Sequence, residues 1–285
     1  MRPELVLPVG CLPATPFRDY ATAAALAGFD SITTWPLCVR RAIGREGLDP
    51  ATMRSIVADL GLRICELDPV SVWLPEPADA GERPALFRSV WERHQFFEVA
   101  SSLGIESLTA VELTGDVPAH DVAIEGFAAL CDDAAEHGLK VALEFMPFSG
   151  VADLAAAMRI VSGADRPNSG VLFDVCHFVR SGGSITEIDA TAAARIASIQ
   201  IGDGLRHCPA DLRDEAMFGR LSPGDGDFGV ATLLAALRDR GVSARIGPEV
   251  YRRGWSERAP DLVASDLMAA TRSVLPHLPD HGGAA

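Results

Sequence analysis

The sequence predicts an α/β protein, a single-domain (β/α)8 barrel, and three observations lead to that prediction. Apolar or β-branched runs of about five residues recur along the chain, as expected for strands buried on both faces of a parallel sheet. Longer segments with helical periodicity separate these runs, and strict alternation of this kind implies right-handed crossovers. The length of 285 residues is typical of one closed barrel.

The elements are expected in a regular order. The eight expected strands are Val6–Gly10, Gly28–Thr33, Arg63–Leu67, Ser107–Val111, Lys140–Glu144, Gly170–Asp174, Ile196–Ile201 and Ala244–Glu249. The expected helices are Tyr20–Ala27, Asp49–Leu60, Pro84–Leu103, Pro118–His137, Val151–Val161, Thr186–Ala194, Phe228–Arg240 and Pro260–Leu275. Asp49 is placed to cap a helix with Pro50 in its first turn, and Gly104 and Gly138 follow the ends of two others. A doubly wound open sheet gives a similar alternation, but no GxGxxG motif follows the first run.

The chain offers no linker that would divide it into domains. Its longest irregular stretch is Gly202–Asp225, inside the expected seventh repeat. We therefore expect one barrel over residues 1–278 and a flexible tail over residues 279–285.

Composition and charge exclude several classes of protein. Hydrophobic residues make up 48% of the chain, which supports a sizeable core. No apolar run approaches the ~20 residues of a membrane span, and the N-terminus is a poor signal peptide, so we expect a cytoplasmic protein. The net charge of −14 argues against a nucleic-acid partner. The six cysteines are too far apart for a zinc ribbon or a disulfide framework. The sequence is compatible with a homo-oligomer and does not determine the oligomeric state.

Oxygen-bearing side chains recur where the expected strands end. Glu144 ends the fifth strand, Asp174 the sixth and Glu249 the eighth, while Gln200 lies near the end of the seventh with Asp203 just beyond it. In a (β/α)8 barrel the carboxyl ends of the strands meet at one mouth. Acids gathered there would repel one another unless a divalent cation lay between them. Capping of the following helices is the plainer alternative for any single acid.

Further residues are candidates for binding a substrate at this mouth. His177 follows Asp174 by three residues and is expected in the loop after the sixth strand. Arg220 lies in the loop after the seventh strand and could bind a carboxylate, phosphate or oxyanion. Glu66 is expected to end the third strand, and Trp35 follows the second. Packing at the rim explains Trp35 equally well.

The strand-end motifs resemble those of the xylose-isomerase-like TIM barrel family, the sugar phosphate isomerases/epimerases related to apurinic endonucleases of family 2 and to dehydroshikimate and inosose dehydratases. The resemblance covers nearly the whole chain. The motifs that carry it are Leu143-Glu144-Phe145, Phe173-Asp174-Val175-Cys176-His177, Ile199-Gln200-Ile201-Gly202-Asp203, Pro223-Gly224-Asp225-Gly226-Asp227-Phe228 and Pro248-Glu249-Val250. The resemblance implies that Glu144, Asp174 and Glu249 bind one divalent metal ion, Mn²⁺ or Mg²⁺. It also implies that the two glutamates move a proton and that His177 contacts the substrate.

The chain departs from that pattern at Gln200, where sugar epimerases of the family generally carry histidine. Glutamine is similar to the dehydroshikimate dehydratase members, and its amide oxygen can still ligate a metal. The zinc-binding histidines of the endonuclease branch are absent from the matching strand ends. Glutamine at this position is compatible with the same class of metal-dependent mechanism, but it leaves the identity of the substrate undetermined.

The strand-end residues and the resemblance together predict a metal-dependent isomerase or epimerase of a sugar or related polyhydroxy carbonyl compound. Glu144 or Glu249 would remove the proton next to the carbonyl, through a metal-stabilised enediolate. Loss of a β-hydroxyl from the same species would make the enzyme a dehydratase, which is the main alternative. A binding barrel without turnover and an abasic-site endonuclease are weaker alternatives.

Overall fold

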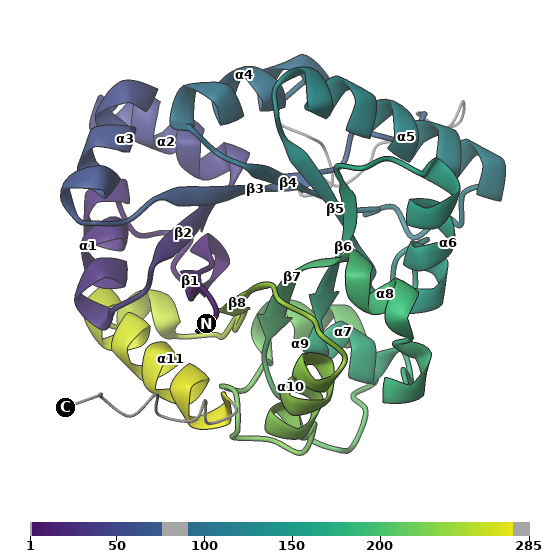
Figure 1. Ribbon diagram of the computed structural model, residues 1–285. Coiled ribbons are helices and arrows are strands. Elements are labelled where there is room, and N and C mark those ends of the chain that lie inside the picture. Colours follow the sequence, from purple (N-terminus) through teal and green to yellow (C-terminus); the bar gives the residue numbers. More distant parts are fainter. Residues whose placement is uncertain (1, 76–90, 276–285) are drawn as a thin grey trace, which may run out of the picture.

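In the computed structural model, which describes residues 2–75 and 91–275, the strands form one parallel sheet in chain order (Figure 1). They are β1 (Val6–Leu7), β2 (Ser31–Thr34), β3 (Ile64–Val70), β4 (Ser107–Ala110), β5 (Lys140–Glu144), β6 (Ser169–Asp174), β7 (Ile196–Ile201) and β8 (Arg245–Pro248). A parallel bridge between Leu5 and Ile246 closes the sheet, and the Ile246 N–H donates to the Glu4 carbonyl at 2.9 Å. The predicted (β/α)8 barrel is therefore confirmed, and the open sheet is excluded.

Helices surround the barrel in a ring (Figure 1). They are α1 (Phe17–Ala27), α2 (Pro36–Glu46), α3 (Pro50–Asp59), α4 (Arg93–Leu103), α5 (His120–Glu136), α6 (Leu154–Ala164), α7 (Val175–Arg180), α8 (Ala190–Arg195), α9 (Leu212–Phe218), α10 (Val230–Asp239) and α11 (Pro260–Val274). The Asp49 carboxylate accepts from the Thr52 N–H at 2.7 Å and so caps α3, as predicted. Gly104 ends α4 in the left-handed conformation, with φ 69°, where a side chain would be strained.

The two faces of the sheet differ: the outer face packs against the helices, and the inner face lines the inside of the barrel. Along β5, Val141 and Leu143 belong to the apolar core shared with the helices, while Glu144 lies on the inner face. The inside of the barrel is polar near its amino-terminal end, where Arg245 donates to the Ser107 hydroxyl at 3.0 Å. Acidic side chains such as Glu144 lie at the opposite, carboxyl end of the barrel.

Several boundaries differ from the sequence prediction. β3 continues to Val70, three residues past the expected end, because its backbone passes Pro69 with a register irregularity. Three helices had not been predicted, namely α2, α7 and α9. They lie in connections where short amphipathic segments give little periodic signal.

The expected helix Thr186–Ala194 is split into a 3-10 turn (Ile185–Glu187) and α8, because Asp189 caps a new helix start by accepting from Ala192 N–H at 2.8 Å. The first part of the expected helix Pro84–Leu103 and the expected tail over 279–285 lie outside the described residues. No helix within the described ranges is both long enough and apolar enough to cross a membrane.

We expect Phe173→Ala to lower the free energy of unfolding by about 3–5 kcal/mol, because it empties a fully buried site. Phe173 packs against Phe178 with ring centroids 4.7 Å apart. Urea unfolding would measure the change. Leu26→Ala serves as the control, since the Leu26 side chain is 76% exposed and should cost less than about 1 kcal/mol. A small effect of Phe173→Ala would contradict the packing described here.

Candidate metal centre

The oxygen-bearing residues predicted at the strand ends all lie at the carboxyl end of the barrel. Glu144 ends β5, Asp174 ends β6, Gln200 is the penultimate residue of β7, and Glu249 directly follows β8. Asp174 pairs in register with Gln200, and Gln200 pairs with Gly247, two residues before Glu249. All four side chains are buried.

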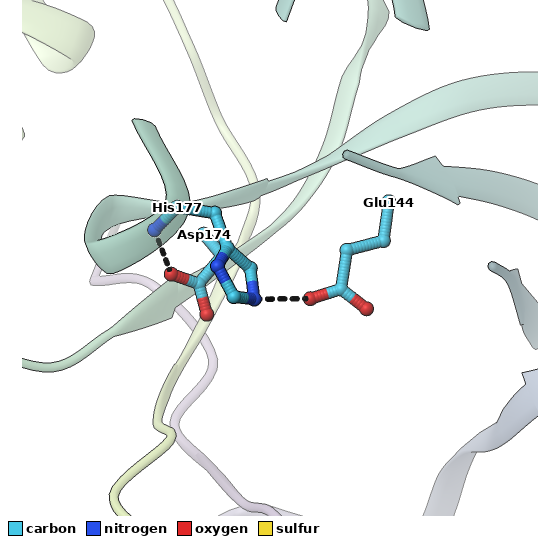
Figure 2. A group of neighbouring side chains, drawn as sticks. All are labelled: Glu144, Asp174 and His177. Atoms are coloured by element: carbon cyan, nitrogen blue, oxygen red, sulfur yellow. Dashed lines mark hydrogen bonds and ion pairs between the residues drawn. The ribbon is translucent and has the colours of Figure 1, made fainter. Parts of the chain in front are cut away.

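Glu144, Asp174 and His177 form the tightest group, with ligand atoms within 4.8 Å of one another (Figure 2). His177 Nε2 lies 3.6 Å from Glu144 Oε1. The Asp174 carboxylate accepts from the His177 N–H at 2.8 Å, which starts α7 directly after the strand. His177 therefore lies in a helix, and its predicted place in a loop is wrong because Asp174 caps that helix.

Arg220 is buried among these acids, with 2% of its surface exposed. Its Nη1 donates to Asp174 Oδ2 at 2.7 Å and to Glu249 Oε2 at 2.9 Å. The guanidinium thus bridges two acids of the chain itself and leaves Glu144 without such a partner. The predicted contact between Arg220 and a substrate stays a prediction.

The contact between Arg220 and His177 fixes the proton on the imidazole ring. Arg220 Nη2 lies 3.1 Å from His177 Nε2, and a guanidinium can only donate, so Nε2 accepts and the ring proton is on Nδ1. The lone pair of Nε2 is then in use. In this arrangement the lone pair of Nε2 faces Arg220.

Gln200 provides the clearest sign that a cation belongs here. Its Oε1 is buried and accepts no hydrogen bond from any residue that the structure describes. An unpaired buried amide oxygen is costly, and a bound ion or water would satisfy it. Together with carboxylates from neighbouring strands it forms a hard donor set suited to a divalent cation.

The electrostatics of the centre reflect an excess of negative charge. Burial, together with the neighbouring charges of Glu249, Asp68 and Asp174, raises the pKa of Glu144 well above its ordinary value. Burial raises the pKa of Glu249 to about 8, against the opposing effect of Arg220. Burial acts in the same direction on Asp174, but Arg220 and His177 outweigh it, and the pKa of Asp174 is lowered. A divalent cation would relieve the repulsion that acts on the two glutamates.

The loop after β7 carries Arg220 into the centre, and Asp203 shapes that loop. The buried Asp203 carboxylate accepts from Gly224 N–H and Phe228 N–H, both at 3.0 Å. The Asp227 carboxylate accepts from the Arg206 N–H at 2.8 Å and so links the start of the loop to its end.

Sequence reasoning missed Asp68 and Tyr251. Asp68 Oδ2 accepts from Trp35 Nε1 at 3.0 Å, and burial raises the pKa of Asp68 to about 7. The Tyr251 hydroxyl donates to Glu249 Oε1 at 2.8 Å. Trp35 and Tyr251 meet edge to face, with ring centroids 6.0 Å apart. Alternation along β3 could have indicated Asp68, since it shares a face with Glu66 two residues earlier.

Glu66 does not end its strand, so the prediction that placed it at the mouth is wrong. β3 extends four residues beyond it, and its carboxylate lies with Arg245, Thr109 and Ser107 deeper in the barrel. Burial raises the pKa of Glu66, and the nearby Arg245 guanidinium opposes that shift. A substrate contact for Glu66 is therefore not what its surroundings favour.

Comparison with known proteins matches this architecture to one family. The profile of the family described as xylose isomerase-like TIM barrel matches residues 21–274. An inosose isomerase of Bacillus licheniformis is 30% identical over 162 residues, which cover 54% of this chain and 57% of that protein. The chain thus spans little more than half the length of this curated relative.

Solved structures share the fold at low sequence identity. The IolI protein with a bound zinc atom superposes with a TM-score of 0.83 at 19% identity, covering 95% of this chain and 98% of that one. A D-psicose 3-epimerase determined in the presence of D-fructose gives a TM-score of 0.69 at 17% identity, covering 95% and 99%.

We expect Gln200→Leu to stabilise the metal-free protein by about 1 kcal/mol, because it removes an unpaired buried oxygen. The same change should weaken Mn²⁺ binding about tenfold or more, because it removes a donor. Thermal melts in chelator and Mn²⁺ titrations would measure the two effects. The isosteric Gln200→Glu variant is the control: it keeps an oxygen donor and should bind Mn²⁺ but be less stable without it. Unchanged Mn²⁺ affinity in Gln200→Leu would contradict the assignment.

We expect the free energy of unfolding of the chelator-treated protein to fall as the pH rises from 6.5 to 8. Asp68 and Glu249, with pKa values raised to about 7 and about 8, stay protonated in the folded state where the unfolded state has ionised, so their stabilisation is lost as they titrate. His177, whose pKa burial lowers to about 4, acts in the opposite direction only below its ordinary value of 6.5.

Urea unfolding at a series of pH values would test this dependence. Glu249→Gln should flatten the slope by up to about 1.4 kcal/mol per pH unit. The exposed cap variant Asp49→Asn should keep the wild-type slope. A wild-type stability that is flat or rises over this range would be inconsistent with the raised pKa values.

Proposed function

The chain belongs to the xylose isomerase-like TIM barrel family, and on that premise we propose that it is a divalent-metal-dependent isomerase or epimerase of a polyhydroxy carbonyl compound. The observation that carries the proposal is the buried group of acids with the unpaired Gln200 oxygen at the barrel mouth. The likeness to an inosose isomerase points to a cyclic polyol ketone or a ketose as the substrate class.

Glu144, Asp174, Gln200 and Glu249 would hold the metal ion, and Mn²⁺ or Mg²⁺ suits their oxygen donors. A bound ion would supply Lewis acidity toward the carbonyl and an adjacent hydroxyl of the substrate. The ion bound in the IolI structure is zinc.

The residues of the chain divide the proton transfer between them. Glu144 and Glu249 come from β5 and from the end of β8, with β6 and β7 between them, so they approach a substrate at the mouth from different sides. The pKa of Glu249 is raised to about 8 and that of Glu144 well above its ordinary value, and raised pKa values favour carboxyls that both give and take a proton. One removes the proton next to the carbonyl to leave an enediolate, and a proton returned at another position or face gives isomerisation or epimerisation.

Neighbouring side chains orient this pair. Tyr251 and Arg220 each donate to one oxygen of Glu249, at 2.8 and 2.9 Å, and so fix the plane of its carboxylate. His177, neutral and held by Arg220, is placed to meet a substrate hydroxyl beside Glu144. Both restraints reduce the reorganisation needed when the proton moves.

The test is solvent-deuterium exchange in D2O with inosose, D-fructose and D-allulose, followed by NMR. Wild-type protein loaded with Mn²⁺ or Mg²⁺ should exchange the proton next to the carbonyl, and chelation should abolish the exchange. Glu144→Gln and Glu249→Gln should each lower the rate about 100-fold or more, because each removes a proton-transferring group. Asp49→Asn, which changes an exposed acid remote from the mouth, should keep the wild-type rate.

The outcomes separate the alternatives. Exchange that survives Glu249→Gln would exclude this residue as a base. Loss of one water from the substrate, detected by mass spectrometry, would identify a dehydratase. Substrate binding without exchange would identify a binding barrel.

A further inference from the structure

Asp68 is a buried carboxylate at the barrel mouth that neither the donor set nor the proton-transferring pair uses. Its Oδ2 accepts from Trp35 Nε1 at 3.0 Å, and its exposed fraction is 9%. Within residues 2–75 and 91–275, no Lys or Arg forms an ion pair with it, and its Oδ1 accepts no hydrogen bond. The Trp35 N–H occupies Oδ2, which leaves Oδ1 available to accept from a ligand.

Asp68 lies close to the other acids at the barrel mouth. The charge of Asp68 contributes to the raised pKa values of Glu144, Glu249 and Tyr251, so Asp68 is an electrostatic neighbour of these three groups. Asp68 is on β3 and Asp174 ends β6, with β4 and β5 between these two strands in the sheet (Figure 1). It is not part of the group of close ligand atoms formed by Glu144, Asp174 and His177.

Trp35 and Tyr251 connect Asp68 to the proton-transferring pair. Trp35 donates to Asp68, packs edge to face on Tyr251, and Tyr251 donates to Glu249. These side chains form one continuous wall from β3 to the residues after β8. A ligand that reaches Asp68 along this wall therefore also lies against Glu249.

We propose that Asp68 is a specificity-determining residue that accepts hydrogen bonds from substrate hydroxyls remote from the carbonyl. The proposal rests on the proposed function and names the part of the substrate that the site selects. A carboxylate oxygen has two lone pairs, so Oδ1 of Asp68 can accept from two vicinal hydroxyls of one substrate. Asp68 thus favours polyols that keep hydroxyls at the end away from the reacting carbon.

The experiment compares steady-state kinetics of wild type and Asp68→Asn with inosose, D-fructose and D-allulose. Analogues that lack one remote hydroxyl provide the second arm. For the full polyol, Asp68→Asn should raise KM about tenfold or more and change kcat less than about threefold, because the lost contact is made in ground and transition states alike. Removing the remote hydroxyl should raise KM for wild type and have little further effect on the variant.

Controls address folding and metal binding. Asp49→Asn makes the same chemical change at an exposed helix cap and should match wild type. Trp35→Phe keeps a ring in the wall but removes the N–H that holds Asp68, so KM should rise in the same direction and less steeply; it also serves if Asp68→Asn fails to fold. Metal content measured by elemental analysis should be unchanged in Asp68→Asn.

Three results would overturn the proposal. If Asp68→Asn keeps the wild-type KM for both the polyol and its deoxy analogue, Asp68 does not recognise hydroxyls. If Asp68→Asn loses the metal, Asp68 is a ligand instead. If wild type exchanges deuterium with none of the probes, the proposed function fails, and the assignment of Asp68 falls with it.

Discussion

Mutual repulsion of acids packed at one end of a barrel is the constraint on which the rest of this structure depends. Glu144, Asp174, Glu249 and Asp68 are all buried there, and water cannot screen them. Arg220 offsets part of the charge by bridging Asp174 and Glu249. Burial and the charge that remains raise the pKa values of Glu144 and Glu249. The same excess of buried negative charge therefore underlies both the proposed cation site and the proposed acid–base role of the two glutamates.

Much of the surrounding architecture serves to keep Arg220 in that position. The loop after β7 is long, and Asp203 organises it by accepting backbone N–H groups at both of its turns. Helix α9 within this loop is tied to α7 by the ion pair of Arg180 with Glu215, whose closest atoms are 2.5 Å apart. These hydrogen bonds and this ion pair hold the loop, and therefore the Arg220 guanidinium, in a defined position although Arg220 is not on a strand.

The sequence predicted the residues at the barrel mouth well where an apolar strand ends in an acid. It predicted them less well where their position depends on how a strand or a long loop continues. All eight strands and the mouth positions of Glu144, Asp174 and Glu249 were predictable, because a polar residue after a buried apolar run stands out. Asp68 was missed because Pro69 reads as the end of a strand, whereas β3 passes through it. The bridging role of Arg220 could not be predicted, since it depends on how a loop of many residues folds back over the barrel. Helix α9 was not predicted because it lies in the same long loop.

The closure between β8 and β1 differs from the other strand pairings. Leu5 and Ile246 form an isolated bridge there, whereas β7 and β8 pair over four positions. Fluctuations that part the cylinder should therefore begin at β1, whose pairings with β2 and with β8 are both short. Glu249 and Tyr251 lie just past the end of β8, so such breathing would shift them while Glu144 and Asp174 stay on continuously paired strands. Of the two glutamates proposed to move the proton, Glu144 is consequently held by a continuously paired strand, whereas Glu249 lies beside a closure that can open.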